Sequence, residues 1–366
     1  MPAVRPGALS YRFGAPGYTR PSRLETMNPE LWERYSRQIL FAGIGEHGQQ
    51  RLLDASAVVV GCGALGSAVA GLLVRAGVGR VRIVDRDFVE LSNLQRQTLF
   101  DENDARESLP KAVAAERNLR AANSAVAVEG VVADLSPANA LDLLSGFSIL
   151  LDGTDNFETR FLLNDAAVRL GLPWVYGAVV ASYGVTMAIE PGRTACLACL
   201  VQDSSGAGHE ETCDTVGIVN SAASLIASLE VSAALRRLAQ AEPLPSRLVS
   251  ADVWTGRFQS VAVPRNPACR CCVRREFPYL EGKAQPHVTM CGRDSVQIHE
   301  RARRLDLAGL GRRLARSAGE VRANDFLLRF RVPPYEVTVF ADGRAIVKGT
   351  KDPAVARSLY ARYIGS

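Results

Sequence analysis

The sequence is poor in cysteine and histidine and carries little net charge. Eight cysteines in 366 residues are too few for the disulfide framework of a secreted protein, and their clustering favours metal binding and reactive thiols in a reducing compartment. The four histidines form no ligand pattern. A formal net charge of +5 is small for a dedicated nucleic-acid-binding protein. We therefore expect neither a disulfide scaffold nor a nucleic-acid partner.

Long apolar runs and a signal-peptide pattern are missing as well. The longest uncharged stretch, residues 170–189, is interrupted by Pro173, Gly177 and Gly184 and fits two strands and a turn rather than a membrane span. The first 30 residues have five prolines and no apolar core of the signal-peptide kind. We expect a soluble, cytoplasmic protein with no membrane partner.

The composition that is present is that of a folded protein, with 47% hydrophobic and 22% charged residues. Residues 1–29 are rich in Pro, Gly and Arg and predict a flexible tail. Between residues 30 and 280, apolar strands alternate with helices, which predicts an α/β fold with a doubly wound, Rossmann-like, mostly parallel sheet. Residues 281–366 predict a small C-terminal α+β domain, including a hairpin around residues 341–343.

A glycine motif, Gly-Cys-Gly-Ala-Leu-Gly at residues 61–66, follows one predicted strand and opens a helix. Gly61 allows a tight turn, Gly63 lets the backbone approach a phosphate, and Gly66 lets the helix pack against the sheet. Asp85, at the end of the next strand, can hold ribose hydroxyls. The motif predicts a nucleotide-binding βαβ unit, and on its own it allows an NAD-dependent oxidoreductase.

Basic and amide side chains follow the second strand. Asn93 and Arg96 lie in the polar stretch 92–97, and Lys111 follows Pro110 at the start of a predicted helix. A nicotinamide cofactor has no need of two cations here, whereas a triphosphate does, because the forked Arg96 and the point charge of Lys111 can both bind phosphate oxygens. The pattern favours ATP, although alone it fits a solvated loop and helix face equally well.

A polar turn, Asp-Gly-Thr-Asp-Asn at residues 152–156, follows another apolar strand. Ligands of open α/β sheets bind beyond the carboxyl ends of the strands, so Asp155 is predicted to hold Mg²⁺ against phosphate oxygens. The same residue types favour a helix N-cap, so Asp155 or Asn156 can also cap the helix that begins at Phe157.

The cysteines include two matching pairs. Two residues separate Cys196 from Cys199 and Cys269 from Cys272, and the pairs are 70 positions apart (269 − 199). Such pairs form a tetrahedral Cys₄ zinc site with no open position, which is a structural site. Cys271 lies inside the second pair, but the two-residue spacing favours Cys269 and Cys272.

Cys213 lies in a polar stretch directly before a long predicted helix. A helix N-terminus makes a thiol more acidic, which favours a nucleophile, whereas the neighbouring Asp214 opposes this. A small loop residue is the alternative. Residues 274–331 have a local excess of basic residues, which can attract an acidic partner protein.

Together these motifs resemble the ThiF/MoeB family, the adenylyltransferases that activate ubiquitin-like sulfur carriers in thiazole and molybdopterin synthesis. The C-terminal segment, with residues 291–294 and 349–352, is similar to an extension on members of the Bacillus type. The segments that carry the resemblance follow the family's order and are residues 34–38, 61–66, 84–87, 92–97, Lys111, 152–156, 177–178, the two cysteine pairs and 211–213.

The resemblance implies a reaction in which the carrier's C-terminal Gly-Gly carboxylate attacks the α-phosphate of ATP, so that an acyl-adenylate forms and pyrophosphate leaves. Sulfur then displaces AMP and gives a thiocarboxylate, which implies a sulfur donor such as a cysteine desulfurase or a rhodanese. The resemblance further implies that Arg37 reaches into the partner subunit's site of a homodimer. Cys213 matches a cysteine that joins the carrier covalently in some relatives.

The implied residues for ATP and Mg²⁺ are Gly61, Gly63, Gly66, Asp85, Asp87, Asn93, Arg96, Lys111, Asp155 and Asn156. Two alternatives stay open. The NAD-dependent oxidoreductase leaves Arg96, Lys111 and the cysteine pairs unexplained. A non-catalytic nucleotide-binding scaffold needs neither Asp155 nor Arg37.

Overall fold

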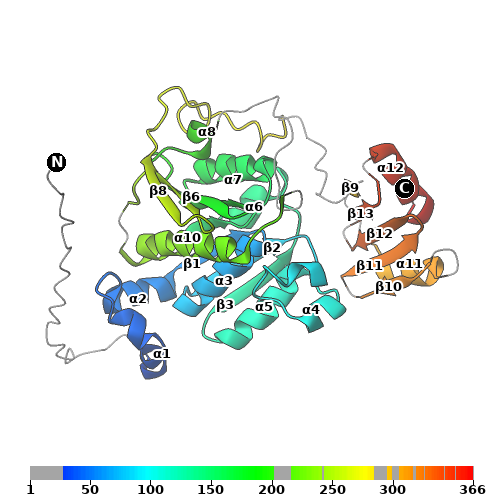
Figure 1. The fold of residues 1–366 in the computed structure, drawn as a ribbon, viewed down its shortest axis with the longest axis horizontal. Coiled ribbons are helices and arrows are strands. Elements are labelled where there is room, and N and C mark those ends of the chain that lie inside the picture. Colours follow the sequence, from blue (N-terminus) through cyan, green and yellow to red (C-terminus); the bar gives the residue numbers. More distant parts are fainter. Residues whose placement is uncertain are drawn as a thin grey trace, which may run out of the picture.

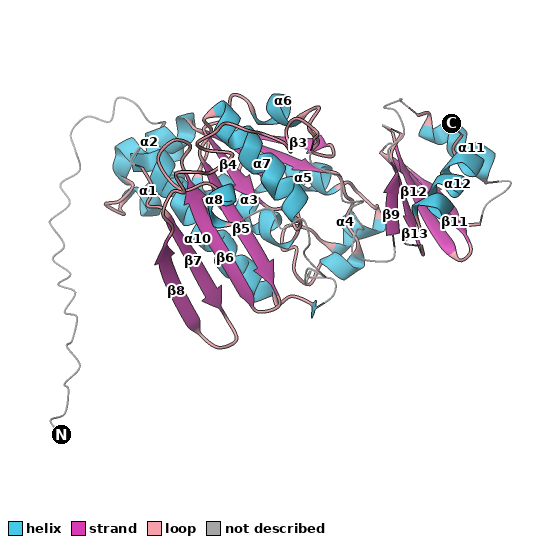
Figure 2. Cartoon of the chain, turned by 90° about the horizontal axis from the view of Figure 1, so that it is seen from above, coloured by secondary structure: helices cyan, strands magenta, loops and turns pink. Residues whose placement is uncertain are grey.

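The computed structural model describes residues 28–201, 216–240, 243–283, 295–298, 305–315, 319–324, 326–341, 343–350 and 352–365. Two sheets organise these residues (Figures 1 and 2). The main sheet has eight strands in the order β3-β2-β1-β4-β5-β6-β7-β8, and the second sheet has five in the order β10-β11-β12-β13-β9.

The main sheet is parallel from β3 to β5 and antiparallel from β5 to β8. Its strands are β1 (Ser56–Val60), β2 (Arg80–Asp85), β3 (Ala127–Val132), β4 (Ile149–Asp152), β5 (Trp174–Val180), β6 (Tyr183–Ile189), β7 (Arg247–Asp252) and β8 (Arg257–Ala262). The strand order reverses between β1 and β4, and ligands of such sheets bind beyond the carboxyl ends of the strands at this point. The predicted Rossmann-like, mostly parallel sheet is confirmed, and β6 to β8 are the strands that extend it in the antiparallel sense.

Helices cover both faces of the main sheet, which explains why its central strands are apolar (Figure 1). One face packs against α3, α5 and α10, and the other against α6 and α7. The helices are α1 (Pro29–Ile39), α2 (Gly45–Asp54), α3 (Ala64–Ala76), the 3₁₀-helix η1 (Leu91–Asn93), α4 (Glu102–Arg106), α5 (Lys111–Ala122), α6 (Ala140–Leu144), α7 (Phe157–Leu170), α8 (Leu197–Leu200) and α10 (Asn220–Gln240). None of these described helices has the length and apolar character needed to cross a bilayer.

The second sheet, which we call the C-terminal sheet, has two different faces. Its elements are β9 (Ser295–Ile298), α11 (Leu307–Leu314), β10 (Val321–Ala323), β11 (Leu327–Val332), β12 (Tyr335–Phe340), β13 (Ala345–Lys348) and α12 (Pro353–Tyr363). One face packs against α11 and α12. The other face presents Leu327, Phe340 and Ile346 to Phe88 of the main body. The predicted hairpin is present as β12 and β13, whereas the domain boundary at residue 280 stays a prediction.

Candidate functional site

The glycine motif forms the turn between β1 and α3. Gly61 has a φ of +86°, and a Cβ there would lie 2.4 Å from the carbonyl oxygen of Gly153. A Cβ on Gly66 would lie 1.9 Å from the carbonyl oxygen of Gly61, so both positions require glycine. Nothing lies within 4 Å of the Cβ position of Gly63, the N-cap of α3. The N-terminus of α3 is therefore open to an approaching anion.

Asp85 holds this turn from the end of β2. Its carboxylate oxygens accept hydrogen bonds from the backbone N–H of Cys62 at 2.5 Å and of Asp87 at 2.6 Å. The side chain is buried, and this burial raises the pKa of Asp85 above its ordinary value. The predicted ribose ligand thus also fixes the glycine turn, and its oxygens keep lone pairs for a hydroxyl donor.

Lys111 and Asp87 form the charged pair of the site. Lys111 is the first residue of α5 after the N-cap Pro110, and its side chain is 9% exposed. Its Nζ lies 3.3 Å from Oδ2 of Asp87, and its backbone N–H donates to the Asp87 carbonyl at 2.8 Å. Burial alone would lower the pKa of Lys111, but the charges of Asp87 and Asp85 outweigh it and raise this pKa, so the ammonium stays charged.

The same charges act on Asp87. Burial works to raise the pKa of Asp87, but Lys111 and Arg86 outweigh it and hold the value below its ordinary range.

Asn93 is buried in η1, where its Oδ1 accepts from the backbone N–H of Glu90 at 3.2 Å. Arg96 is half-buried and donates to the Ser92 carbonyl at 2.9 Å.

Asp155 and Asn156 lie in the turn after β4. Asn156 caps α7, because its Oδ1 accepts from the backbone N–H of Thr159 at 2.9 Å, so one of the two predicted caps is present. Asp155 is exposed, and its Oδ1 accepts from Nδ2 of Asn156 at 3.2 Å. The charge of Asp155 is among those that raise the pKa of Lys111 against the effect of burial, and the turn that carries Asp155 lies against Gly61 through Gly153.

Sequence reasoning missed two charged residues below this turn. Arg160 of α7 is buried and donates to Oδ2 of Asp152 at 3.3 Å and to the carbonyl of Thr154 at 2.7 Å. Glu230 of α10 is also buried, and a Cβ on Gly177 would lie 1.7 Å from its Oε1. A single charge among the small and apolar residues in the middle of α10 is the signal that could have identified Glu230. Arg160 lies in the polar first turn of α7 and has no such signal.

The four predicted cysteines lie together. Their sulfur atoms are all within 4.8 Å of one another, with Cys196 3.6 Å from Cys269 and Cys199 3.5 Å from Cys272. Zinc–sulfur bonds of about 2.3 Å at tetrahedral angles place sulfurs about 3.8 Å apart, so the group has the size of a metal centre. Cys271 is not one of these four: its sulfur accepts from Nδ2 of Asn164 at 3.1 Å and is also a hydrogen-bonding neighbour of Cys196.

One predicted residue, Arg37, is not brought to the site within one chain. Arg37 is exposed on α1, whose Tyr35 packs against Gly77 at the end of α3 that is opposite to the glycine motif. Cys213 lies outside the described residues, as does the predicted motif around it.

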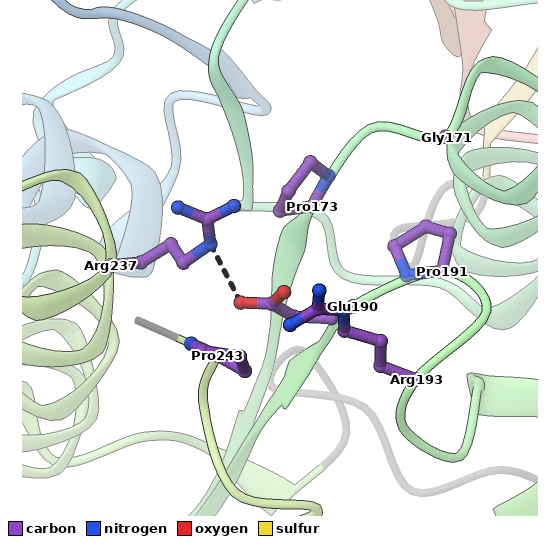
Figure 3. Close-up of a pocket in the computed structure, with 7 residues that line it drawn as sticks. All are labelled: Gly171, Pro173, Glu190, Pro191, Arg193, Arg237 and Pro243. Carbon is purple, nitrogen blue, oxygen red and sulfur yellow. Dashed lines mark ion pairs between the residues drawn. The ribbon is translucent and has the colours of Figure 1, made fainter. Parts of the chain in front are cut away.

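A pocket elsewhere on the main body contains none of the predicted residues (Figure 3). Arg237 points toward Glu190 in it, and their side chains form an ion pair of 2.7 Å. Its lining residues are Gly171, Pro173, Glu190, Pro191, Arg193, Arg237 and Pro243. Gly171 and Pro173 precede β5, so the pocket lies at the opposite edge of the sheet from the turn after β4.

The chain is similar to proteins of known family. It is 46% identical over 336 residues to the sulfur carrier protein ThiS adenylyltransferase of Bacillus subtilis, which covers 91% of this chain and 99% of that protein. It is also 40% identical over 251 residues to the sulfur carrier protein adenylyltransferase of Thermus thermophilus. That match covers 66% of this chain and 91% of that protein. The crystal structure of E. coli MccB with succinimide shares its fold, with a TM-score of 0.58 and 24% identity over 65% of this chain and 74% of that chain. Residues 35–271 match the ThiF family, and this chain therefore belongs to the ThiF family.

Proposed function

We propose that this chain uses ATP to adenylate the C-terminal carboxylate of a ubiquitin-like sulfur carrier protein and releases pyrophosphate. The observation that carries the proposal is the convergence of Lys111, Asp87 and Asp155 beside the open N-terminus of α3. These residues offer both a phosphate site and a carboxylate for a divalent cation. Two relatives of this chain bear names that state sulfur carrier adenylation.

The residues perform the reaction by positioning and by neutralising charge. The N–H groups at the start of α3 face the phosphates, and Lys111 and Arg96 supply positive charge. The side-chain amide of Asn93 donates to the nucleotide, and Asp85 accepts from the ribose. An attack by one carboxylate on phosphorus needs aligned groups and stabilised charge more than it needs a protein nucleophile.

Asp155 is the proposed ligand of Mg²⁺, with Asn156 beside it. It is exposed, it lies at the switch point of the sheet, and it has the oxygen ligands that this ion prefers. Bound Mg²⁺ supplies neutralisation of the phosphate charge. Asp87 instead pairs with Lys111 and so keeps the ammonium in place.

The cysteine group is the proposed site of a structural zinc ion. Cys196, Cys199, Cys269 and Cys272 provide four thiolates at suitable spacing, with no open position for a substrate. Zinc would join the start of α8 to the segment that follows β8.

A homodimer is proposed from the position of Arg37. Its side chain is exposed and is remote from the glycine motif of its own chain, so the guanidinium is available to the site of the partner subunit. The use of Cys213 and the nature of the sulfur donor are further predictions of the family resemblance.

The direct test is ATP–pyrophosphate exchange in the presence of each candidate Gly-Gly carrier. Exchange that depends on one carrier is expected. Asp155→Ala should abolish exchange while ATP binding partly survives, because the phosphate site remains. Asp142→Ala, at an exposed aspartate of α6, is the matched control and should behave as the wild type. Unchanged exchange in Asp155→Ala would contradict the assignment.

A further inference from the structure

The C-terminal sheet contacts the segment that carries the phosphate-binding residues. This segment, residues 87–111, begins at Asp87 and ends at Lys111. Phe88 is 6% exposed and packs among Leu327, Phe340 and Ile346 of the C-terminal sheet. The contact is therefore made one residue after Asp87.

Two polar contacts support this apolar one. Nζ of Lys348, at the end of β13, donates to Oε1 of Glu90 at 2.7 Å and lies 5.7 Å from the centroid of the Phe88 ring. Glu90 in turn caps η1, so Lys348 acts on the turn that holds Asn93. Asn324, after β10, donates through Nδ2 to the carbonyl of Glu107 at 3.2 Å and to that of Ser108 at 3.3 Å.

Both ends of segment 87–111 are joined to one another. Phe88 forms a β-bridge with Pro110, and the backbone N–H of Val89 donates to the carbonyl of Leu109 at 2.8 Å. Ser108 has a φ of +48°, a backbone conformation that residues other than glycine rarely adopt without support from their surroundings. Its carbonyl is one of those that Asn324 contacts. The contacts from β10, β11, β12 and β13 thus meet the backbone that places Asp87 and Lys111.

A buried arginine of the C-terminal sheet also interacts with the phosphate-binding segment. Arg344 precedes β13 and is 1% exposed. Its charge adds to those of Lys111 and Arg86 that, against the effect of burial, lower the pKa of Asp87. Figures 1 and 2 both show the C-terminal sheet on the side of the main body that carries α4.

We propose that the C-terminal sheet is a positioning element of the nucleotide site, which sets the affinity for ATP by holding segment 87–111 through Phe88, Glu90 and Ser108. The inference rests on the proposed function only for the identity of the nucleotide. Lys348 and Asn324 are the positioning residues, and neither is expected to touch ATP.

Two nearly isosteric variants test the proposal in the full-length protein. Lys348→Met keeps the aliphatic stem over Phe88 and loses the charge. Asn324→Asp keeps the oxygen that accepts from the N–H groups of Phe326 and Leu327 but can no longer donate to Glu107 and Ser108. Each should raise the KM and the Kd for ATP about tenfold, with kcat and the KM for the carrier changed less than about twofold. Lys348→Arg keeps the positive charge and should have the KM and the Kd for ATP of the wild type.

Arg362→Ala is the matched control, because Arg362 is an exposed cation of α12 on the other face of the C-terminal sheet. The Kd is measured by equilibrium dialysis with ATP and Mg²⁺, without a carrier. If no carrier supports exchange, the proposed function fails while this binding measurement still tests the sheet. An ATP Kd within twofold of wild type in both variants overturns the inference, and so does a rise in the KM for the carrier alone.

Discussion

Lys111, Arg160 and Glu230 are ionisable residues whose side chains are almost completely buried. Lys111 has Asp87 as its partner, and Arg160 has Asp152. Neither carboxyl oxygen of Glu230 has a hydrogen-bond partner among the residues that the structure describes. Burial, and next the charge of Asp152, raise the pKa of Glu230 well above its ordinary value. Glu230 is therefore protonated in the folded protein at pH values where the unfolded chain has lost the proton.

This difference predicts how stability depends on pH. Below the ordinary pKa of a glutamate, both states are protonated and Glu230 has no effect. As the pH rises above that value, the unfolded chain releases the proton and the folded chain keeps it, so the free energy of unfolding falls by about 1.4 kcal/mol per pH unit until the folded-state pKa is passed. Glu230→Gln cannot ionise and should be more stable than the wild type at pH 8, with little difference at pH 4.

Thermal unfolding across this pH range checks the prediction. Glu102→Gln provides the control, since Glu102 is 75% exposed on α4. Equal pH dependence in Glu230→Gln and the wild type would show that Glu230 ionises normally in the folded state.

At the scale of elements, the ion pair between Arg160 and Asp152 joins α7 to the end of β4. Both side chains are buried, and Arg160 also donates to the carbonyls of Thr154 and Gly177. Arg160→Met leaves the carboxylate of Asp152 buried without its cation, so the free energy of unfolding should fall by about 3 kcal/mol. Urea denaturation measures this change. Arg169→Met changes an exposed arginine of the same helix and should leave the midpoint unchanged. A midpoint equally unaffected by Arg160→Met would refute the structural role of the pair.

Local elements were predictable where a residue marks their ends. Gly77 and Gly171 end α3 and α7 with left-handed conformations, and a glycine at such a position marks the end of a helix in the sequence. Helix α2 was not predicted, because Ile44 at its N-cap makes no side-chain cap bond and its position depends on packing. The sequence also could not show that Asp85 accepts from the N–H of Cys62, since this bond joins residues 23 positions apart.

Residues of the candidate site were predictable where they lie at the end of a strand or the start of a helix. Spacing predicted Lys111 and Asp155 as site residues, because each follows a strand or opens a helix at the switch-point edge. It could not identify Arg160 or Glu230, whose importance comes from tertiary neighbours, nor the support that Lys348 gives to Glu90 from 258 positions away.

At the scale of the whole molecule, the two cysteine pairs predicted from their spacing join parts of the main body that are far apart in the sequence. Cys196 begins α8, while Cys269 and Cys272 follow β8, so a bound metal would close a loop of more than 70 residues. We expect one zinc per chain in protein purified without chelators. Removal of the metal should lower the melting temperature by about 10 °C, because ion binding is coupled to the folded arrangement of the four thiolates.

Metal analysis of two serine variants, both in the segment that follows β8, tests whether the four cysteines bind zinc. Cys269→Ser removes one of four ligands and should lose zinc and stability together. Cys271→Ser is the matched control, because Cys271 is not one of the four grouped sulfurs and a serine hydroxyl can still accept the hydrogen bond from Asn164. It should keep one zinc per chain. Loss of zinc from Cys271→Ser but not from Cys269→Ser would assign the fourth ligand to Cys271, whereas absence of zinc from the wild-type protein would refute the metal centre.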